Sequence, residues 1–168
     1  GWGAGRDRLT GRAAASSILA ALVGGERSGE GKDIGMALFE CRVAVLANQA
    51  MAYLVGNNGP FRMGNAHPNI VPYQVFATHD SHVILAVGND IQFGRFCALA
   101  NCAELADDAR FTRNQDRVRN RVELVAKLTQ IMAGKSTAQW LEILEPEGIP
   151  CGRINRIDEA LNDPQVTH

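Results

Sequence analysis

The chain has 168 residues, 46% of them hydrophobic, and a formal net charge of −1. Its length and composition fit one globular domain, or one domain with part of another. Its near-neutral net charge gives no indication of nucleic acid as a partner. No apolar run approaches the roughly 20 residues that span a bilayer, and residues 1–11 lack the basic and apolar regions of a secretory signal. We therefore expect a cytoplasmic protein with no membrane partner.

The first third of the chain has a helical pattern. Thr10 or Gly11 can begin a helix that Gly24 and the next glycine end. The polar, glycine-rich residues 25–33 predict a turn, and they lack the spacing of a phosphate-binding Walker loop. Residues 34–55 predict a second helix with apolar side chains on more than one face. Such a helix is expected to lie between two bodies of protein.

Residues 62–90, RMGNAHPNIVPYQVFATHDSHVILAVGND, predict an ordered loop followed by a β-hairpin. Gly64 and Asn65 supply a place where φ can be positive, and the prolines keep their neighbours extended. Residues 73–77 and 83–87 have the apolar patterns of strands, and the residues between them form the turn. The sequence alone therefore predicts a hairpin packed on helices.

Beyond the hairpin the pattern is again mostly helical. Asp90 can cap a helix over residues 90–99, and Thr112 or Asn114 can begin a long helix that ends at residue 134. Two further helices are expected over residues 136–145 and 157–161, and residues 149–154 have strand character. The expected fold class is α+β, with helices packed on a small, mostly antiparallel sheet and preceded by long linker helices.

Few residues stand out as chemical groups in this pattern. Asp80 lies in a turn, where aspartate commonly bonds backbone amides, and Asp7 precedes the first expected helix, whose macrodipole would favour a negative charge there. His67 lies beside a proline, and His79 with His82 forms a His-x-x-His pair that is a weak metal signal without further ligands. No metal site is predicted.

The remaining candidates also favour structural interpretations. The cysteines form no CxxC pair and match no zinc spacing with the histidines, so we expect free thiols in a reducing compartment. The basic string has acidic residues interspersed and no interleaved aromatics, which favours a solvated helix face over a nucleic-acid surface. The cysteines are Cys41, Cys97, Cys102 and Cys151, and the basic string is Arg113, Arg117, Arg119 and Arg121.

Several motifs taken together carry a family resemblance over essentially the whole chain. They are Asp7-x-x-x-Gly11, ILAALVGGERSGEGKDIGMALFE, RMGNAHPNIVPYQVF, HVILAVGND, DDARFTRNQDRVRNR and IPCGRI. In this order they resemble the family III CoA-transferases, which include formyl-CoA:oxalate CoA-transferase, the carnitine CoA-transferase and α-methylacyl-CoA racemase. The form GNAHPNIVPYQVF is most similar to the subgroup that transfers CoA to dicarboxylic or formyl groups.

The resemblance implies roles for particular residues. Asp7 matches the family nucleophile, whose carboxylate forms a mixed anhydride and then an aspartyl-CoA thioester. Gly64, Asn65 and His67 match the loop above the active site. The substrates would be a coenzyme A thioester and a small carboxylic acid, with no tightly bound cofactor. In the racemase relatives the matching aspartate is instead half of an acid/base pair, which leaves that chemistry as an alternative.

The resemblance also implies a domain layout. Residues 1–40 match the end of a large CoA-binding domain, residues 41–60 a linker helix, and residues 61–168 a small α+β domain. The relatives form interlocked homodimers and carry a nucleotide-binding half that has no counterpart here. The chain is therefore expected to be a fragment that is inactive alone and forms a homodimer. A stand-alone association domain without catalysis is the alternative.

Overall fold

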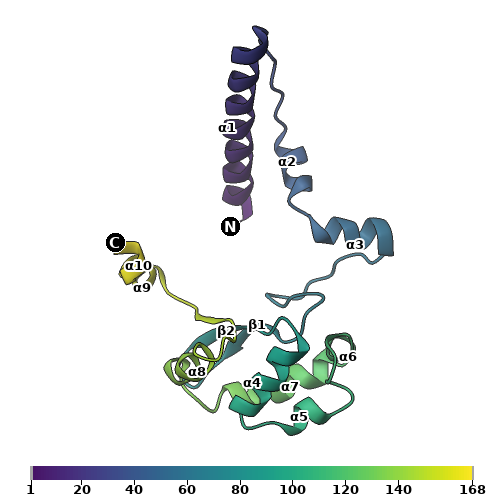
Figure 1. Cartoon of the computed structure of the whole chain (residues 1–168), viewed down its shortest axis with the longest axis vertical. Helices are drawn as coiled ribbons and strands as arrows, with labels where there is room; N and C mark the ends of the chain where they lie inside the picture. Colours follow the sequence, from purple (N-terminus) through teal and green to yellow (C-terminus); the bar gives the residue numbers. More distant parts are fainter. Residues whose placement is uncertain (1, 168) are drawn as a thin grey trace. The chain divides into compact units, whose positions relative to one another are not determined.

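The computed structural model describes residues 2–167, without the side chains of residues 2–4 and 6, and these residues form two compact units (Figure 1). Unit 1 is Gly1–Arg62 and unit 2 is Met63–His168. Unit 1 is built of helices alone, whereas unit 2 contains a sheet and a buried core. The assignment of residues 1–40 and 41–60 to parts of a larger protein stays a prediction.

The described residues of unit 1 form α1 (Trp2–Ser28), α2 (Leu38–Ala44) and α3 (Asn48–Gly56). The predicted bounds of the first helix are wrong, because α1 already includes Thr10 and continues through Gly24. It stops where Gly29 takes a φ of +74°, with its N–H donating to the carbonyl of Gly25 at 2.8 Å. A glycine with positive φ commonly ends a helix, and here that glycine comes later than the pair chosen from sequence.

The single helix predicted for residues 34–55 is also wrong. Residues 34–37 lie outside any helix, and the helical part is broken between α2 and α3 at Ala47, which has a φ of +43°. Positive φ is costly for alanine, so nothing in its residue type signals this break. No single described helix is long and apolar enough to cross a membrane, and only α2 and α3 together, bent by 75°, pass that test.

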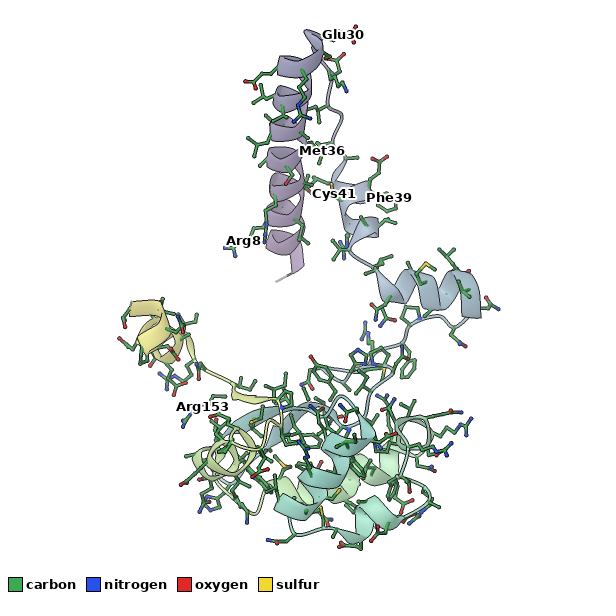
Figure 2. The ribbon with its side chains drawn as sticks, in the orientation of Figure 1. Arg8, Glu30, Met36, Phe39, Cys41 and Arg153 are labelled. Atoms are coloured by element: carbon green, nitrogen blue, oxygen red, sulfur yellow. The ribbon has the colours of Figure 1, made fainter. Side chains whose placement is uncertain are left out.

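Unit 1 exposes its apolar side chains. None of its described residues is buried, although α2 packs beside α1. Phe39 points away from α1 and is 77% exposed, whereas Cys41 lies on the side of α2 that faces α1 (Figure 2). Leu54 and Val55 on α3 are as open to solvent as Phe39. The helices of unit 1 therefore cover little of one another's apolar surface.

The sheet of unit 2 confirms the predicted hairpin. Strands β1 (Tyr73–Ala77), β2 (His82–Ala86) and β3 (Cys151–Arg153) are antiparallel in the order β1-β2-β3, with Val75 opposite Ile84. In the turn, Asp80 does bond a backbone amide, as expected, but the amide is that of Thr137, 2.8 Å away at the start of α8. This hydrogen bond lowers the pKa of the Asp80 carboxyl and ties the hairpin to that helix.

The helices of unit 2 are α4 (Asp90–Leu99), α5 (Glu104–Asp107), α6 (Asn114–Arg119), α7 (Arg121–Met132), α8 (Thr137–Leu144), α9 (Ile157–Leu161) and α10 (Pro164–Thr167). Side chains of α4 to α8 pack in a continuous core, to which α9 and α10 contribute no buried residue. Trp140 of α8 is fully buried, and its Nε1 donates to the carbonyl of Met132 at 2.8 Å. The four cysteines are free, and Cys97 and Cys102 lie in this core. The α+β fold class is confirmed.

Two local predictions in unit 2 need correction. Asn89, not Asp90, caps α4, because its Oδ1 accepts from the Gln92 N–H at 2.9 Å. The long helix predicted for residues 114–134 is divided into α6 and α7 at Asn120. The Asn120 side chain donates to the carbonyls of Asp116 and Arg110, at 3.0 and 3.2 Å. It thereby competes with the backbone hydrogen bonds that a continuous helix would make.

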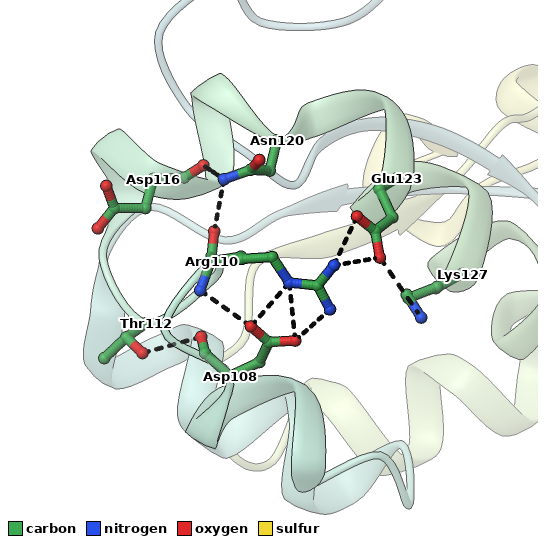
Figure 3. Close-up of polar contacts among 7 residues, drawn as sticks. All are labelled: Asp108, Arg110, Thr112, Asp116, Asn120, Glu123 and Lys127. Atoms are coloured by element: carbon green, nitrogen blue, oxygen red, sulfur yellow. Dashed lines mark hydrogen bonds and ion pairs between the residues drawn. The ribbon is translucent and has the colours of Figure 1, made fainter.

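A network of charged groups fixes the loop that precedes α6 (Figure 3). The Arg110 guanidinium bonds both oxygens of Asp108 and also both oxygens of Glu123 on α7, the latter at 2.8 Å. Lys127 approaches Glu123 at 3.8 Å. The hydrogen bonds from Arg110 lower the pKa of Asp108 to about 2.

Asp108→Asn should reduce stability in a pH-dependent way. A carboxyl with a folded pKa of about 2 and an unfolded pKa of about 3.9 stabilises the folded state fully above about pH 4 and loses this effect as the pH falls toward 2. The variant should therefore unfold at lower urea than wild type at pH 6, and the difference should vanish near pH 2. Asp107→Asn, a neighbouring exposed carboxyl without a hydrogen bond in the described residues, is the control. A difference that is independent of pH would contradict this role.

Candidate functional site

Asp7, the predicted nucleophile, lies in the second turn of α1, and its side chain is exposed. It is inside the helix rather than before it, and the first turn of α1 contains no acidic residue. Because the macrodipole acts mainly within the first turn, the interpretation of Asp7 as a helix-entry charge does not fit. Its carboxylate is accessible from solvent, as an attacking carboxylate must be.

Gly64 and Asn65 form the turn that opens the loop of residues 63–72. Gly64 has a φ of +64°, and the N–H of Ala66 donates to the carbonyl of Met63 at 3.2 Å. The Oδ1 of Asn65 accepts from the N–H of Val75 at 3.0 Å. Since β1 is an edge strand, this hydrogen bond satisfies a backbone donor that no neighbouring strand reaches.

His67 is held by its backbone and by its ring. Its N–H donates to the carbonyl of Tyr73 at 2.9 Å, and its imidazole stacks on the Tyr73 ring with centroids 5.2 Å apart. Its Nδ1 accepts from the N–H of Asn69 at 3.1 Å. Because a backbone N–H can only donate, Nδ1 presents a lone pair, and the proton of the neutral imidazole is on Nε2.

Side chains from α6 and α7 hold the rest of this loop. Asn114 accepts from the N–H of Val71 at 3.1 Å and donates to the carbonyl of Asn69 at 2.8 Å. The Nη2 of Arg121 donates to the carbonyls of His67 and Pro68, at 3.0 and 2.7 Å. The loop therefore has a fixed conformation without belonging to a helix or strand.

Arg117 lies beneath the loop and is fully buried. Its Nε donates to the carbonyl of Val71 at 2.7 Å, and its Nη2 bonds Asp90 at 2.8 Å. Nη1 donates to the carbonyls of Phe111 and Thr112, and the guanidinium lies 4.4 Å from the centre of the Phe93 ring. Burial lowers the pKa of Arg117 and the contact with Asp90 raises it, while an arginine stays protonated throughout the range in which proteins fold.

The interpretation of the basic string as a solvated face is wrong for the buried Arg117 and the half-buried Arg121. It is correct for Arg113 and Arg119, which are exposed. The signal was present in the spacing. Asn114, Arg117 and Arg121 are three and four residues apart, which places side chains on one face of a helix. A count of charges along the string does not distinguish these faces.

The structure brings Gly64, Asn65 and His67 together in one loop of unit 2, whereas Asp7 belongs to unit 1. His79 and His82 lie at the turn end of the hairpin, away from this loop in sequence. Among residues 2–167, no group of three or more His, Cys, Asp or Glu side chains could hold a metal ion. The two candidate elements are therefore an exposed carboxylate on a helix and an ordered polar loop.

Arg117→Met should destabilise unit 2 by about 3–5 kcal/mol, because it removes a buried cation and leaves the carbonyls that it bonds without a donor. Urea unfolding followed by circular dichroism at neutral pH measures this loss. Arg119→Met removes the same charge from an exposed position and should change stability by about 0.5 kcal/mol or less. Equal losses in the two variants would contradict a structural role for the buried guanidinium.

Comparison with known proteins identifies relatives of this chain. The succinate–glutarate CoA-transferase of Agrobacterium fabrum is 46% identical over 95% of this chain and 40% of its own length. The mouse succinyl-CoA:glutarate CoA-transferase is 40% identical over 96% of this chain and 37% of its own length. This chain thus spans about two fifths of the length of these curated relatives.

A solved structure shows the same fold at high sequence identity. The CAIB/BAIF family protein from Brucella suis superposes with a TM-score of 0.75 and 44% identity, over 95% of this chain and 42% of the other. Residues 4–168 match the profile of CoA-transferase family III. Because this match covers nearly every residue, the chain belongs to CoA-transferase family III.

Proposed function

We propose that this chain is part of an enzyme that moves CoA between an acyl-CoA and a small dicarboxylic acid. The 46% identity to a succinate–glutarate CoA-transferase over nearly the whole chain carries this proposal. The mouse relative, named for succinyl-CoA and glutarate, supports the same class of acid. The thioester is a substrate, and the reaction needs no tightly bound cofactor.

The proposed chemistry uses Asp7 as a nucleophile. Its carboxylate attacks the thioester carbonyl, the CoA thiolate leaves, and a mixed anhydride joins the acyl group to Asp7. The thiolate then attacks the aspartyl carbonyl, which releases the first acid and leaves an aspartyl-CoA thioester. The acceptor carboxylate attacks this thioester, and the thiolate finally takes the new acyl group and frees Asp7. The exposed position of the Asp7 side chain supports this role.

A second candidate function is association without catalysis. No described residue of unit 1 is buried, and Phe39, Leu54 and Val55 are each more than 70% exposed. Apolar surface on this scale commonly marks a contact with more protein. We propose that a second copy of the chain covers this apolar surface in a homodimer. Such a homodimer is compatible with catalysis and is equally compatible with a domain that only associates.

Asp7→Asn should abolish transfer in the protein that carries this sequence. Succinyl-CoA and glutarate are the substrates, and kcat should fall on the order of 10⁴-fold or more because the amide cannot form the anhydride. Mass spectrometry of wild type quenched during turnover should find CoA bound to the peptide that contains Asp7.

Glu26→Gln, which changes another exposed acid of α1, is the matched control and should keep the wild-type rate. Turnover by Asp7→Asn at the wild-type rate would exclude Asp7 as the nucleophile. A wild-type protein that transfers CoA to neither glutarate nor succinate would overturn the substrate class. A protein that dimerises and transfers to no acid would favour the association function.

A further inference from the structure

The turn that ends α4 brings two cysteines together. Asn101 follows the helix with a φ of +54°, and its N–H donates to the carbonyl of Ala98. The N–H of Cys102 donates to the carbonyl of Cys97 at 2.9 Å. These two hydrogen bonds form a Schellman motif, in which the side chains at the positions of Cys97 and Cys102 commonly contact each other. The two thiols therefore come from opposite ends of one tight turn.

The backbone of this turn keeps the two cysteines within reach of a disulfide. A Cα atom lies about 1.5 Å from the N and about 2.4 Å from the carbonyl O of its own residue. The N–O distance of 2.9 Å therefore holds the Cα atoms of Cys97 and Cys102 less than about 7 Å apart. Cysteines separated by more than about 7 Å cannot be bridged without movement of the backbone. This pair satisfies that limit.

The side chains of the pair also contact each other inside the core. Cys97 and Cys102 are both buried. The hydrogen bond between their thiols lowers the pKa of Cys102 and raises the pKa of Cys97, which burial raises further. Because the thiolate is the form that reacts with oxidants, Cys102 is the more reactive of the two. Cys97 lies beside it as the second thiol that a disulfide requires.

The other two cysteines do not have this arrangement. Cys151 begins β3, where burial and the charge of Glu145 raise the pKa of its thiol. Cys41 lies on α2 of unit 1. Among residues 2–167, neither makes a backbone hydrogen bond to another cysteine. Both can therefore be replaced without touching the turn after α4.

We propose that Cys97 and Cys102 are a redox-sensitive pair, which hydrogen peroxide converts into an internal disulfide and a dithiol opens again. The Cys102 thiolate attacks one peroxide oxygen and becomes a sulfenic acid, while the O–O bond breaks and hydroxide leaves to take up the proton that Cys102 released. The Cys97 sulfur then attacks the sulfenic sulfur, and its own proton leaves with the hydroxyl group as water. The two thiols thus lose two hydrogens, and the peroxide becomes two waters.

Such a disulfide would act on the helix that the buried cation of unit 2 depends on. α4 bonds Arg117 through Asp90 at its start and contributes Phe93 and Phe96 to the core. A bridge from Cys97 to Cys102 closes a ring of six residues and fixes the other end of this helix. The ring restricts the unfolded chain more than the folded one, so oxidation should stabilise unit 2. The pair does not depend on the proposed CoA transfer.

Peptide mapping tests whether the disulfide forms in the folded chain. Wild type and the Cys41→Ser/Cys151→Ser double variant are treated with hydrogen peroxide, alkylated without reductant and digested with trypsin. The mass of the double variant should fall by about 2 Da, the loss of two hydrogens. The tryptic peptide of residues 96–110, which contains both cysteines, should carry no alkyl group. Treatment with dithiothreitol before alkylation should restore alkylation at both positions.

Three results of this mapping would overturn the proposal. One is a pair of alkylated thiols in this peptide at every peroxide concentration that leaves the protein folded. Another is the addition of oxygen to either cysteine without a disulfide. The third is a disulfide that joins two copies of the chain in place of the internal one.

Thermal unfolding tests whether the bridge fits the native turn. The oxidised double variant should keep its near-ultraviolet circular dichroism and unfold at a Tm higher by about 5 °C or more. Cys97→Ala and Cys102→Ala, each in the same background, lack one partner and should have the same Tm before and after peroxide. A lower Tm or a lost near-ultraviolet signal in the oxidised double variant would show that the bridge requires unfolding, and would overturn the proposal.

Discussion

Unit 2 depends on a buried cation that joins segments far apart in the sequence. Arg117 bonds the loop of residues 63–72 through Val71, the loop before α6 through Phe111 and Thr112, and α4 through Asp90. Taking a guanidinium out of water is costly, and the cost is offset only when its donors all find acceptors in good geometry. Three of the four acceptors are backbone carbonyls, which Arg117 satisfies in place of water. The loop and the helical core are thus stabilised by one set of hydrogen bonds.

This arrangement explains how a loop without regular structure holds a side chain in place. Backbone groups between Asn69 and Val71 bond Asn114 and Arg117, and those of His67 and Pro68 bond Arg121. The supporting residues all lie on α6 and α7, which are anchored in the core by Leu124, Leu128 and Met132. A polar group that rigid elements already hold in place loses less conformational entropy when a ligand binds.

Much of unit 2 could be predicted from local patterns. The alternation in residues 73–77 and the apolar run in residues 83–87 predict the hairpin, and Ser136 with Gln139 forms the capping box of α8. The buried Arg117 could not be read from composition, because the burial of a charge depends on acceptors that only the tertiary fold assembles. The break at Ala47 likewise has no sequence signal, since a positive φ at alanine contradicts its own preference.

The two units differ in a way that residue type alone does not show. Both contain apolar helices, but only unit 2 buries them, and α1 leaves Ile18, Leu19 and Leu22 at least half exposed. A helix is stabilised mainly by packing of its apolar face, and in unit 1 this packing is largely absent among the described residues. The proposed nucleophile and the loop of residues 63–72 therefore differ in setting, because the first lies on a helix with exposed apolar side chains and the second is supported by a buried core.

That difference bears on selectivity. The anhydride and thioester chemistry proposed for Asp7 involves only a carboxyl group, which every candidate acid possesses, so it cannot by itself distinguish one acid from another. Selection must come from groups that contact the remainder of the acid.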